Sequence, residues 1–173
     1  IESVLAQTFQ DFEIILVNDG STDNSEHVVN SISDDRIKYF SQKNEGASVA
    51  RNVAISKAHG TYIALLDADD LWHDTYLETI NRLITSYPDQ MVFATAVTIE
   101  TSGNAIPSVY SIPNIKEKET YVVDYFQSSS INTLLTSSST VVHYSVFKKT
   151  GMYDTAIKSG QDTDLWIRIG IHF

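Results

Sequence analysis

The stretch IALLDADDLW, from Ile63 to Trp72, constrains the fold of this chain more than any other segment. Four apolar residues run directly into Asp67, and Asp69 and Asp70 follow within three positions. An apolar run of this length between turn signals is typical of a buried strand in a parallel sheet. Open parallel sheets bind ligands at the carboxyl ends of their strands. We therefore expect the three carboxylates to lie at a ligand site.

The same three carboxylates predict a metal ion. Neighbouring negative charges repel one another, and a cation would offset that repulsion. Oxygen ligands suit hard divalent ions, and Mg²⁺ is usually held by one or two carboxylates together with substrate phosphates. The motif therefore predicts a site for Mn²⁺ or Mg²⁺. A simpler role is also open, because one of the acids could be the N-cap of the helix that follows, although capping alone does not require three.

Strand and helix signals alternate over the first 99 residues. Apolar runs predict strands at 12–17, 36–41, 61–66 and 91–99. Helices are predicted from a cap at Ser21, Thr22 or Asp23 to about Ser33, at 46–59 and at 74–87. This order predicts an α/β domain with a mostly parallel, doubly wound sheet and helices on both faces, a Rossmann-like arrangement.

The alternation stops after Ile99. Residues 101–119 show no sustained period and predict a long irregular excursion, a type of loop that is often functional. A helix is predicted at 120–127, a strand at 139–144, and one or two helical turns at 145–150. One of Asp162 and Asp164 is expected to cap a C-terminal helix, which leaves the other for acid–base work.

Composition limits the partners and the setting. The net charge of −10 argues against nucleic acid or an anionic membrane as the main partner. The lack of cysteine excludes a disulfide scaffold, a thiolate zinc site and a cysteine nucleophile. No apolar run approaches membrane-spanning length and no signal peptide opens the chain, so a cytoplasmic setting is expected, with any membrane contact made by segments outside this chain.

Two further segments carry candidate ligand contacts. Asp19 follows the strand predicted at 12–17, where its carboxylate could accept a hydrogen bond from a base or a ribose. Gly46 and the small residues after it would let a helix N-terminus come close to an anion. Arg51, in the second turn of that helix, could reach a nucleotide, although a single arginine could equally form a surface salt bridge.

Taken together, these segments resemble the inverting family-2 glycosyltransferases, which have the A-type glycosyltransferase fold. The resemblance runs from Ser3 to Arg168, and it rests on the order and spacing of SVLAQTF, VNDGSTDNS, NEGASVARN, LLDADDLW, GMYD and QDTDLWIR. It implies transfer of a sugar from a nucleotide-sugar, with a UDP-sugar favoured, to a saccharide or glycolipid acceptor in polysaccharide or glycoconjugate synthesis. It also implies a metal ion that bridges the diphosphate.

The resemblance assigns roles to individual residues. The nucleotide would be contacted by Asp19, Asn44, Arg51 and Asp67. The metal would be held by Asp69, the second acid of the Asp-x-Asp motif, and the acceptor hydroxyl would be deprotonated by Asp162. The secondary candidates are Asp70, Gln161 and Asp164.

Two departures from the family pattern stand out. The family's first strand would precede Ile1, so the 173 residues are expected to be a fragment of a single catalytic domain. Within it, 1–99 would be the half that binds the nucleotide-sugar, and 100–173 the acceptor-side half with the base. Gln161 also stands where the family usually has Glu.

Two other classes place an acidic cluster after an apolar strand. A phosphohydrolase of the haloacid-dehalogenase type uses the first Asp as a nucleophile, but it has the motif on its first strand and a Thr or Val where this chain has Asp70. A non-enzymatic, metal-binding receiver-like domain would be shorter and has no place for residues 101–144. Mn²⁺-dependent binding of a donor analogue would separate the transferase from both.

Overall fold

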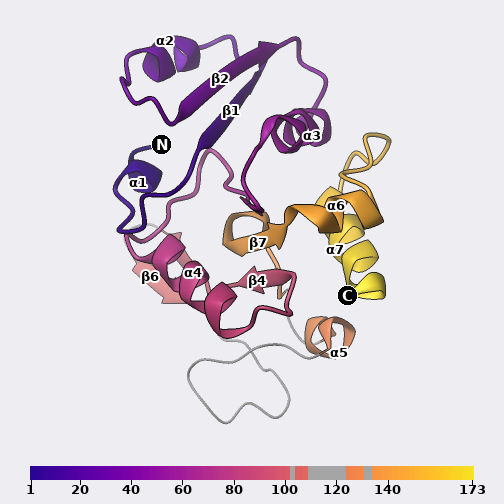
Figure 1. The fold of residues 1–173 in the computed structure, drawn as a ribbon. Helices are drawn as coiled ribbons and strands as arrows, with labels where there is room; N and C mark the ends of the chain where they lie inside the picture. Colours follow the sequence, from indigo (N-terminus) through magenta and orange to yellow (C-terminus); the bar gives the residue numbers. More distant parts are fainter. Residues whose placement is uncertain (102–103, 109–123, 131–133) are drawn as a thin grey trace.

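The computed structural model describes residues 1–101, 104–108, 124–130 and 134–173, and Figure 1 shows the arrangement of its elements. In chain order these are α1 (Glu2–Leu5), β1 (Ile14–Asp19), α2 (Ser25–Asn30), β2 (Ile37–Gln42), α3 (Ala47–Lys57), β3 (Tyr62–Ala64), α4 (Tyr76–Ser86), β4 (Val92–Ala94), β5 (Thr98–Thr101), β6 (Asn104–Pro107), α5 (Tyr125–Ser129), the 3₁₀ turn η1 (Ser137–Ser139), β7 (Thr140–His143), α6 (Tyr144–Thr150) and α7 (Gln161–His172).

The first two strands form a parallel pair. β1 and β2 run side by side in register from the Ile14–Ile37 pair to the Asp19–Gln42 pair. Helix α3 packs on β1. Because both strands end at the same edge, the loops that leave them are brought together there. This is the parallel unit that the alternation of strand and helix signals predicts.

A second sheet has β7 at its centre, between β3 and β4. β7 is antiparallel to both, with Val142 opposite Ile63 and Val141 opposite Phe93. Strands β3 and β4 therefore run parallel to each other with a strand from late in the chain between them. The α/β class is confirmed, while the reversed central strand could not be read from hydrophobic periodicity, which carries no information about strand direction.

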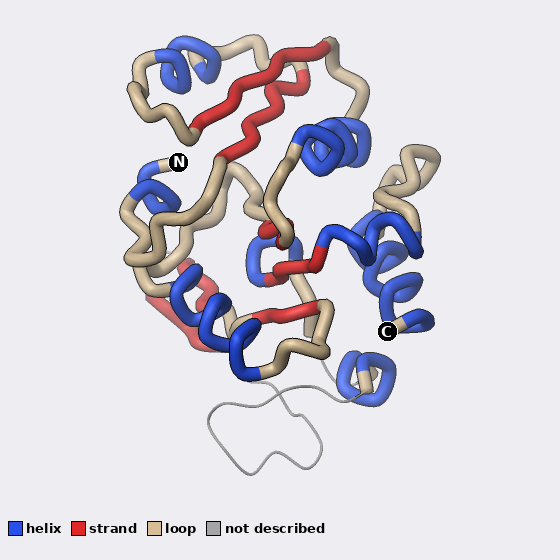
Figure 2. The backbone as a smooth tube through the Cα atoms, viewed as in Figure 1, coloured by secondary structure: helices blue, strands red, loops and turns tan. Residues whose placement is uncertain are grey.

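Helices cover both faces of this second sheet (Figure 2). Val142 and Val141 are buried on opposite faces of β7, because successive side chains of a strand alternate. The face with Val142 packs against side chains of α3, α6 and α7, including Ile55, Phe147 and Leu165. The face with Val141 packs against α4.

The acidic triplet does not cap the helix that follows it, so this expectation was wrong. Helix α4 begins at Tyr76 after the N-cap Thr75. Residues 71–75 are not helical, because other segments hold them in place. The indole N–H of Trp72 donates to the Ser138 carbonyl at 2.6 Å, and the backbone N–H of Thr8 donates to the Asp74 carbonyl at 2.8 Å.

Two other helices also begin at residues other than those predicted. α2 begins at Ser25 with Asn24 as N-cap and ends at Asn30, and the Asp23 carboxylate accepts from the Ser25 N–H at 3.0 Å. Helix α7 has Gly160 as N-cap, at φ +80°, with no side-chain cap hydrogen bond. Neither Asp162 nor Asp164 is therefore the cap, because the left-handed glycine already turns the chain into the helix.

Part of the irregular excursion is a hairpin. β5 and β6 pair antiparallel, from the Thr98–Pro107 pair to the Thr101–Asn104 pair. Residues 102–103 and 109–119 of the excursion, and 120–123 of the helix predicted at 120–127, lie outside the described residues. The rest of that helix is shifted, because α5 starts at Tyr125 after Asp124, whose carboxylate accepts from the Gln127 N–H at 2.9 Å.

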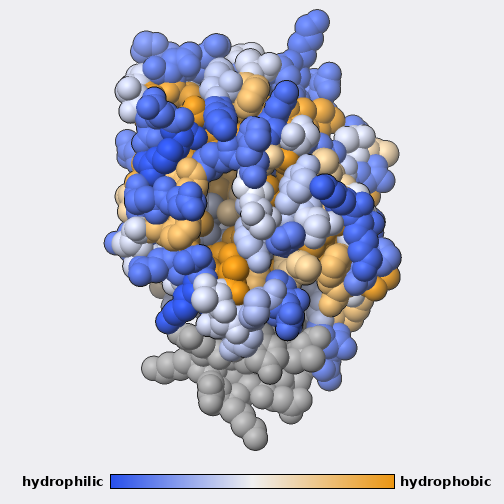
Figure 3. All heavy atoms as spheres, in the orientation of Figure 1, coloured by the Kyte–Doolittle hydropathy of each residue, from blue (hydrophilic) through white to orange (hydrophobic). Residues whose placement is uncertain are grey.

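Figure 3 shows that hydrophilic residues cover most of one face, with hydrophobic residues between them near the middle. In the described part of the chain no helix has both the length and the apolar character needed to cross a membrane.

Candidate active site

Asp19, at the end of β1, organises the loop before α3. Its carboxylate accepts from the backbone N–H groups of Glu45 at 2.9 Å and Gly46 at 2.8 Å, and from the Gln42 amide at 2.8 Å. Partial burial would raise the pKa of Asp19, but these three hydrogen bonds outweigh it and hold the pKa below its ordinary value. The carboxylate therefore stays charged and fixes the loop that carries Asn44.

Gly20 allows this loop to come close to β1. Its φ is +77°, and a Cβ built on it would lie 2.8 Å from the Asn44 nitrogen. We expect Gly20→Ala to lower the free energy of unfolding by about 1–3 kcal/mol, because it adds both a strained backbone and a clash. Gly46→Ala is the matched control, since Gly46 has φ +97° but open space around the added Cβ. Equal losses in urea unfolding of the two variants would contradict a role for the close approach to Asn44.

Arg51 joins two carboxylates that are far apart in the sequence. Its Nη2 lies 2.6 Å from Asp67 Oδ1, and its Nη1 lies 3.6 Å from Asp162 Oδ1. The guanidinium also lies over the Tyr153 ring, 5.3 Å from its centroid. Burial would lower the pKa of Arg51, but the hydrogen bond and the negative charge of Asp67, together with the charge of Asp162, raise it above its ordinary value. Arg51 is thus a permanent cation between the strand-end acid and the acid on α7.

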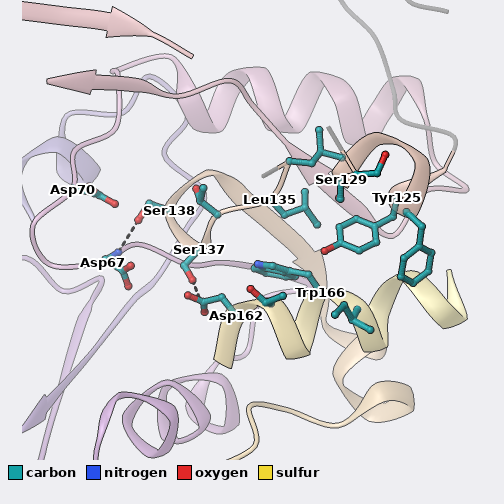
Figure 4. A pocket seen from close by; sticks show the side chains of 15 residues that line it. Asp67, Asp70, Tyr125, Ser129, Leu135, Ser137, Ser138, Asp162 and Trp166 are labelled. Carbon is teal, nitrogen blue, oxygen red and sulfur yellow. Dashed lines mark hydrogen bonds between the residues drawn. The ribbon is translucent and has the colours of Figure 1, made fainter. Parts of the chain in front are cut away.

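The segment before β7 holds the same two acids from the other side (Figure 4). Ser137 Oγ donates to Asp162 Oδ1 at 2.9 Å, and Ser138 Oγ accepts from the Asp67 N–H at 3.0 Å. Burial raises the pKa of Tyr153, whose hydroxyl lies 3.5 Å from Ser137 Oγ. Sequence reasoning missed these contacts of the serine cluster. The only signal for them was its polarity directly before a strand.

Asn52 connects α3 to the turn that follows α6. Its side-chain amide donates to the Tyr153 carbonyl and accepts from the Tyr153 N–H, both at 2.9 Å and across 101 positions of sequence. This paired contact fixes the Tyr153 backbone under Arg51. Sequence reasoning did not single out Asn52.

We expect Asn52→Ala to lower the free energy of unfolding by about 1–3 kcal/mol, because it leaves the Tyr153 N–H and carbonyl without their partner. Chemical denaturation checks this, with Asn30→Ala at the end of α2 as a control that should change stability little. A loss of stability no larger than that of Asn30→Ala would show that the paired contact of Asn52 with Tyr153 does not stabilise the protein.

Asp164 has a structural setting that differs from that of Asp162. It pairs with Arg168 at 2.7 Å, and Arg168 also donates to the carbonyls of Thr150 and Met152 at 2.7 and 2.8 Å. This contact ties α7 to the turn at Gly151. Asp164 is therefore bound to its own helix and to a turn, while Asp162 faces Ser137 and Arg51.

A cavity of about 580 Å³ lies beside Asp162. It is lined by the acidic loop after β3, by α5, by the segment 134–138 and by the start of α7, and Figure 4 shows how these side chains converge. Of the predicted site residues, the lining includes Asp67, Asp70 and Asp162. Arg51 joins this group through its ion pairs. The remaining candidates lie outside the lining: Asp19, Asn44, Asp69, Gln161 and Asp164.

Asp69, the predicted metal ligand, is exposed. Within the described ranges, no group of three or more His, Asp or Glu side chains is arranged to hold a metal ion. The protein part of any metal site among these residues would therefore consist of one or two carboxylates.

Comparison with known protein families assigns the chain to one of them. The sequence model of the glycosyl transferase family 2 matches residues 1–151, most of the chain. The chain belongs to glycosyl transferase family 2. This assignment sets aside the phosphohydrolase and the receiver-like domain as alternatives. The matched range includes Asp19, Arg51 and Asp69, and it ends before α7 and Asp162.

Curated relatives of this family-2 chain carry glycosyltransferase names. An "Uncharacterized glycosyltransferase" of Rickettsia felis is 35% identical over 98% of this chain and 27% of its own length. "Glycosyltransferase GlyG" of Streptococcus pneumoniae is 41% identical over 49% of this chain and 29% of its own length. The chain thus spans under a third of these two relatives.

Solved structures show the same fold. S. aureus TarS 1–349 superposes with a TM-score of 0.78 at 22% identity, over 98% of this chain and 50% of that one. The same protein in complex with UDP-GlcNAc gives a TM-score of 0.77 at 22% identity, over 98% and 48% of the two chains. These likenesses confirm the fold expected for a family-2 glycosyltransferase.

Proposed function

We propose that this protein is a metal-dependent, inverting glycosyltransferase that moves a sugar from a UDP-sugar to an acceptor hydroxyl in polysaccharide or glycoconjugate synthesis. The observation that carries the proposal is the ion-pair bridge of Arg51 to Asp67 and Asp162. This bridge brings Asp67, from the half proposed to bind the donor, and Asp162, from the half proposed to bind the acceptor, to a single site. A transferase needs this juxtaposition, because the donor's anomeric carbon must meet both the leaving diphosphate and the attacking hydroxyl.

The donor nucleotide would lie at the carboxyl ends of β1 and β3. Asp19 is the last residue of β1, and its carboxylate holds the loop that carries Asn44 through the Gly46 N–H. Arg51, on α3, pairs with Asp67 in the loop after β3. The structure of TarS with UDP-GlcNAc supports a UDP-sugar as donor. Arg51 is a fixed cation that could pair with a diphosphate, because an arginine fork suits phosphate oxygens.

The carboxylates in the loop after β3 are suitable ligands for a divalent ion. Asp69 offers an exposed carboxylate, and Asp70 lines the cavity next to it. An ion with one or two protein carboxylates would take its other ligands from the diphosphate and water, as Mg²⁺ commonly does. Such an ion stabilises the charge of the leaving diphosphate as a Lewis acid.

Asp162 is proposed as the general base. Ser137 and Arg51 hold its Oδ1, and the residue lines the cavity where an acceptor would enter. The acceptor oxygen would bond to the anomeric carbon as the bond from that carbon to the diphosphate oxygen breaks. The acceptor's proton would pass to Asp162. Attack and departure on opposite faces of the sugar invert its configuration.

Thermal unfolding with a panel of nucleotide-sugars tests the donor side. We expect UDP-sugars to raise the Tm in the presence of Mn²⁺ and to do so less without it. Asp19→Ala and Arg51→Ala should each weaken UDP binding, measured by calorimetry at a temperature where both variants are folded. Arg36→Ala is the control, because Arg36 pairs with Asp34 away from the site. Unaltered UDP affinity in both site variants would show that these residues do not contact the nucleotide.

A further inference from the structure

We propose that Ser138 positions the acidic loop, residues 67–72, for the divalent ion on the donor diphosphate, with the Trp72 side chain as its partner. This inference rests on the proposed metal-dependent transfer and assigns two further residues to it. Neither residue needs to touch the ion or the nucleotide. They are positioning residues, because they act through the carboxylates of the loop.

Ser138 holds both ends of the acidic loop. Its Oγ accepts from the Asp67 backbone N–H at 3.0 Å, a contact drawn as a dashed line in Figure 4. Its backbone carbonyl accepts from the indole N–H of Trp72 at 2.6 Å. These bonds cross 71 and 66 positions of sequence, so the loop starts and ends on one residue of a distant segment.

The middle of the acidic loop is not held by burial. Asp69 and Asp70 are exposed, and Leu71 is 78% exposed. The like charges of the two carboxylates repel each other, which favours a looser loop. The bonds at the two ends of the loop therefore have a large share in its order. Groups that orient metal ligands without touching the ion commonly raise the affinity for the metal.

The segment that carries Ser138 is a firm support for the loop. Its neighbours Ser137 and Ser139 are buried. Thr140, the first residue of the central strand β7, is fully buried, and its hydroxyl donates to the Thr136 carbonyl at 2.6 Å. Ser138 is thus fixed relative to β7, and its two bonds fix the ends of the acidic loop relative to the same sheet.

The Trp72 ring is held on its other side by helix α4. It stacks on the ring of Tyr76, with the centroids 4.4 Å apart and the planes 25° from parallel. Trp72→Phe keeps an aromatic ring in this stack and removes the N–H that reaches Ser138. Tyr76→Phe is the matched control, because the buried Tyr76 hydroxyl makes no hydrogen bond to any residue that the structure describes.

The test is calorimetric titration of UDP with and without Mn²⁺ in the intact natural protein. The ratio of the two affinities is the gain that the ion provides. We expect Ser138→Ala and Trp72→Phe each to reduce this gain by about fivefold, because each removes one bond to the loop. The affinity without Mn²⁺ should stay nearly unchanged. Ser138→Thr keeps the hydroxyl and should keep most of the gain.

Two controls and a measurement without metal accompany the titration. Tyr76→Phe should keep the full gain, as should Ser31→Ala, which removes a hydroxyl that donates to the Val28 carbonyl at the end of α2. In the metal-free protein, the Asp67 amide proton should exchange with solvent faster in Ser138→Ala than in the unmodified chain, because its acceptor is gone.

Urea unfolding of the same variants separates positioning from a purely structural role. A loss of stability with an unchanged gain in both Ser138→Ala and Trp72→Phe would overturn the inference. Equal reductions of the gain in Ser138→Ala and Ser138→Thr, or an unchanged exchange rate of the Asp67 amide, would also overturn it. If the unmodified protein gained no UDP affinity from Mn²⁺, the proposed metal dependence would fail as well. A normal gain that neither variant lowers would count against this inference alone.

Discussion

Asp162→Asn is expected to reduce turnover by about 10² or more while UDP binding and the Tm stay nearly unchanged. Asparagine keeps the shape and can still accept the Ser137 hydroxyl bond, which is 2.9 Å long in the unmodified chain. It lacks the basic oxygen that would take the acceptor's proton. Steady-state turnover with a UDP-sugar and an acceptor saccharide, together with UDP calorimetry and thermal unfolding, measures all three quantities.

Asp164→Asn is the matched control, two positions along α7. It weakens the half-exposed ion pair with Arg168, so we expect a loss of stability of up to about 1 kcal/mol and little change in turnover at a temperature where the variant is folded. If Asp164→Asn abolished turnover and Asp162→Asn retained it, the base would have been assigned to the wrong residue.

Asp69→Ala is expected to remove the Mn²⁺ dependence of UDP binding and most of the affinity that the ion provides. The fold should survive, because Asp69 is exposed. Calorimetric titration of UDP with and without Mn²⁺ gives the two affinities. In the unmodified protein they should differ by at least about tenfold, equivalent to about 1.4 kcal/mol, and in the variant they should be nearly equal.

Glu26→Gln is the control for this measurement, because it removes one exposed carboxylate on α2, away from the acidic loop. Its UDP affinity should still rise with Mn²⁺. An Asp69→Ala protein that binds UDP as tightly as the unmodified one in Mn²⁺ would show that the ion, if it is needed, is held elsewhere.

The sequence predicted the parts of the site that follow strand ends. Asp19 and Asp67 lie where apolar runs end, and the rule for parallel sheets predicts that residues at such positions face a ligand. The pairing of Arg51 with both Asp67 and Asp162 could not be predicted in this way. It depends on how α3 and α7 pack against the sheet, which is a tertiary property.

The errors have a common physical origin. Acidic residues near a helix start were assumed to cap it, but Gly160 and Thr75 are the N-caps of α7 and α4. Long-range hydrogen bonds instead engage the chain near these helix starts, as between Ser137 and Asp162. Local propensity cannot show such bonds, because their partners are distant in the sequence. The contacts of the serine cluster before β7 were missed for the same reason.

Because β7 comes late in the chain, the second sheet cannot be completed early in synthesis. β3 and β4 emerge from the ribosome well before β7, the strand with which both of them pair. At ordinary rates of translation the wait lasts about 2–10 s, during which both strands have unpaired edges. A chain cut after residue 99 would keep these edges permanently and is expected to aggregate. Residues 1–99 therefore depend on residues 140–143 to complete the sheet to which β3 and β4 belong.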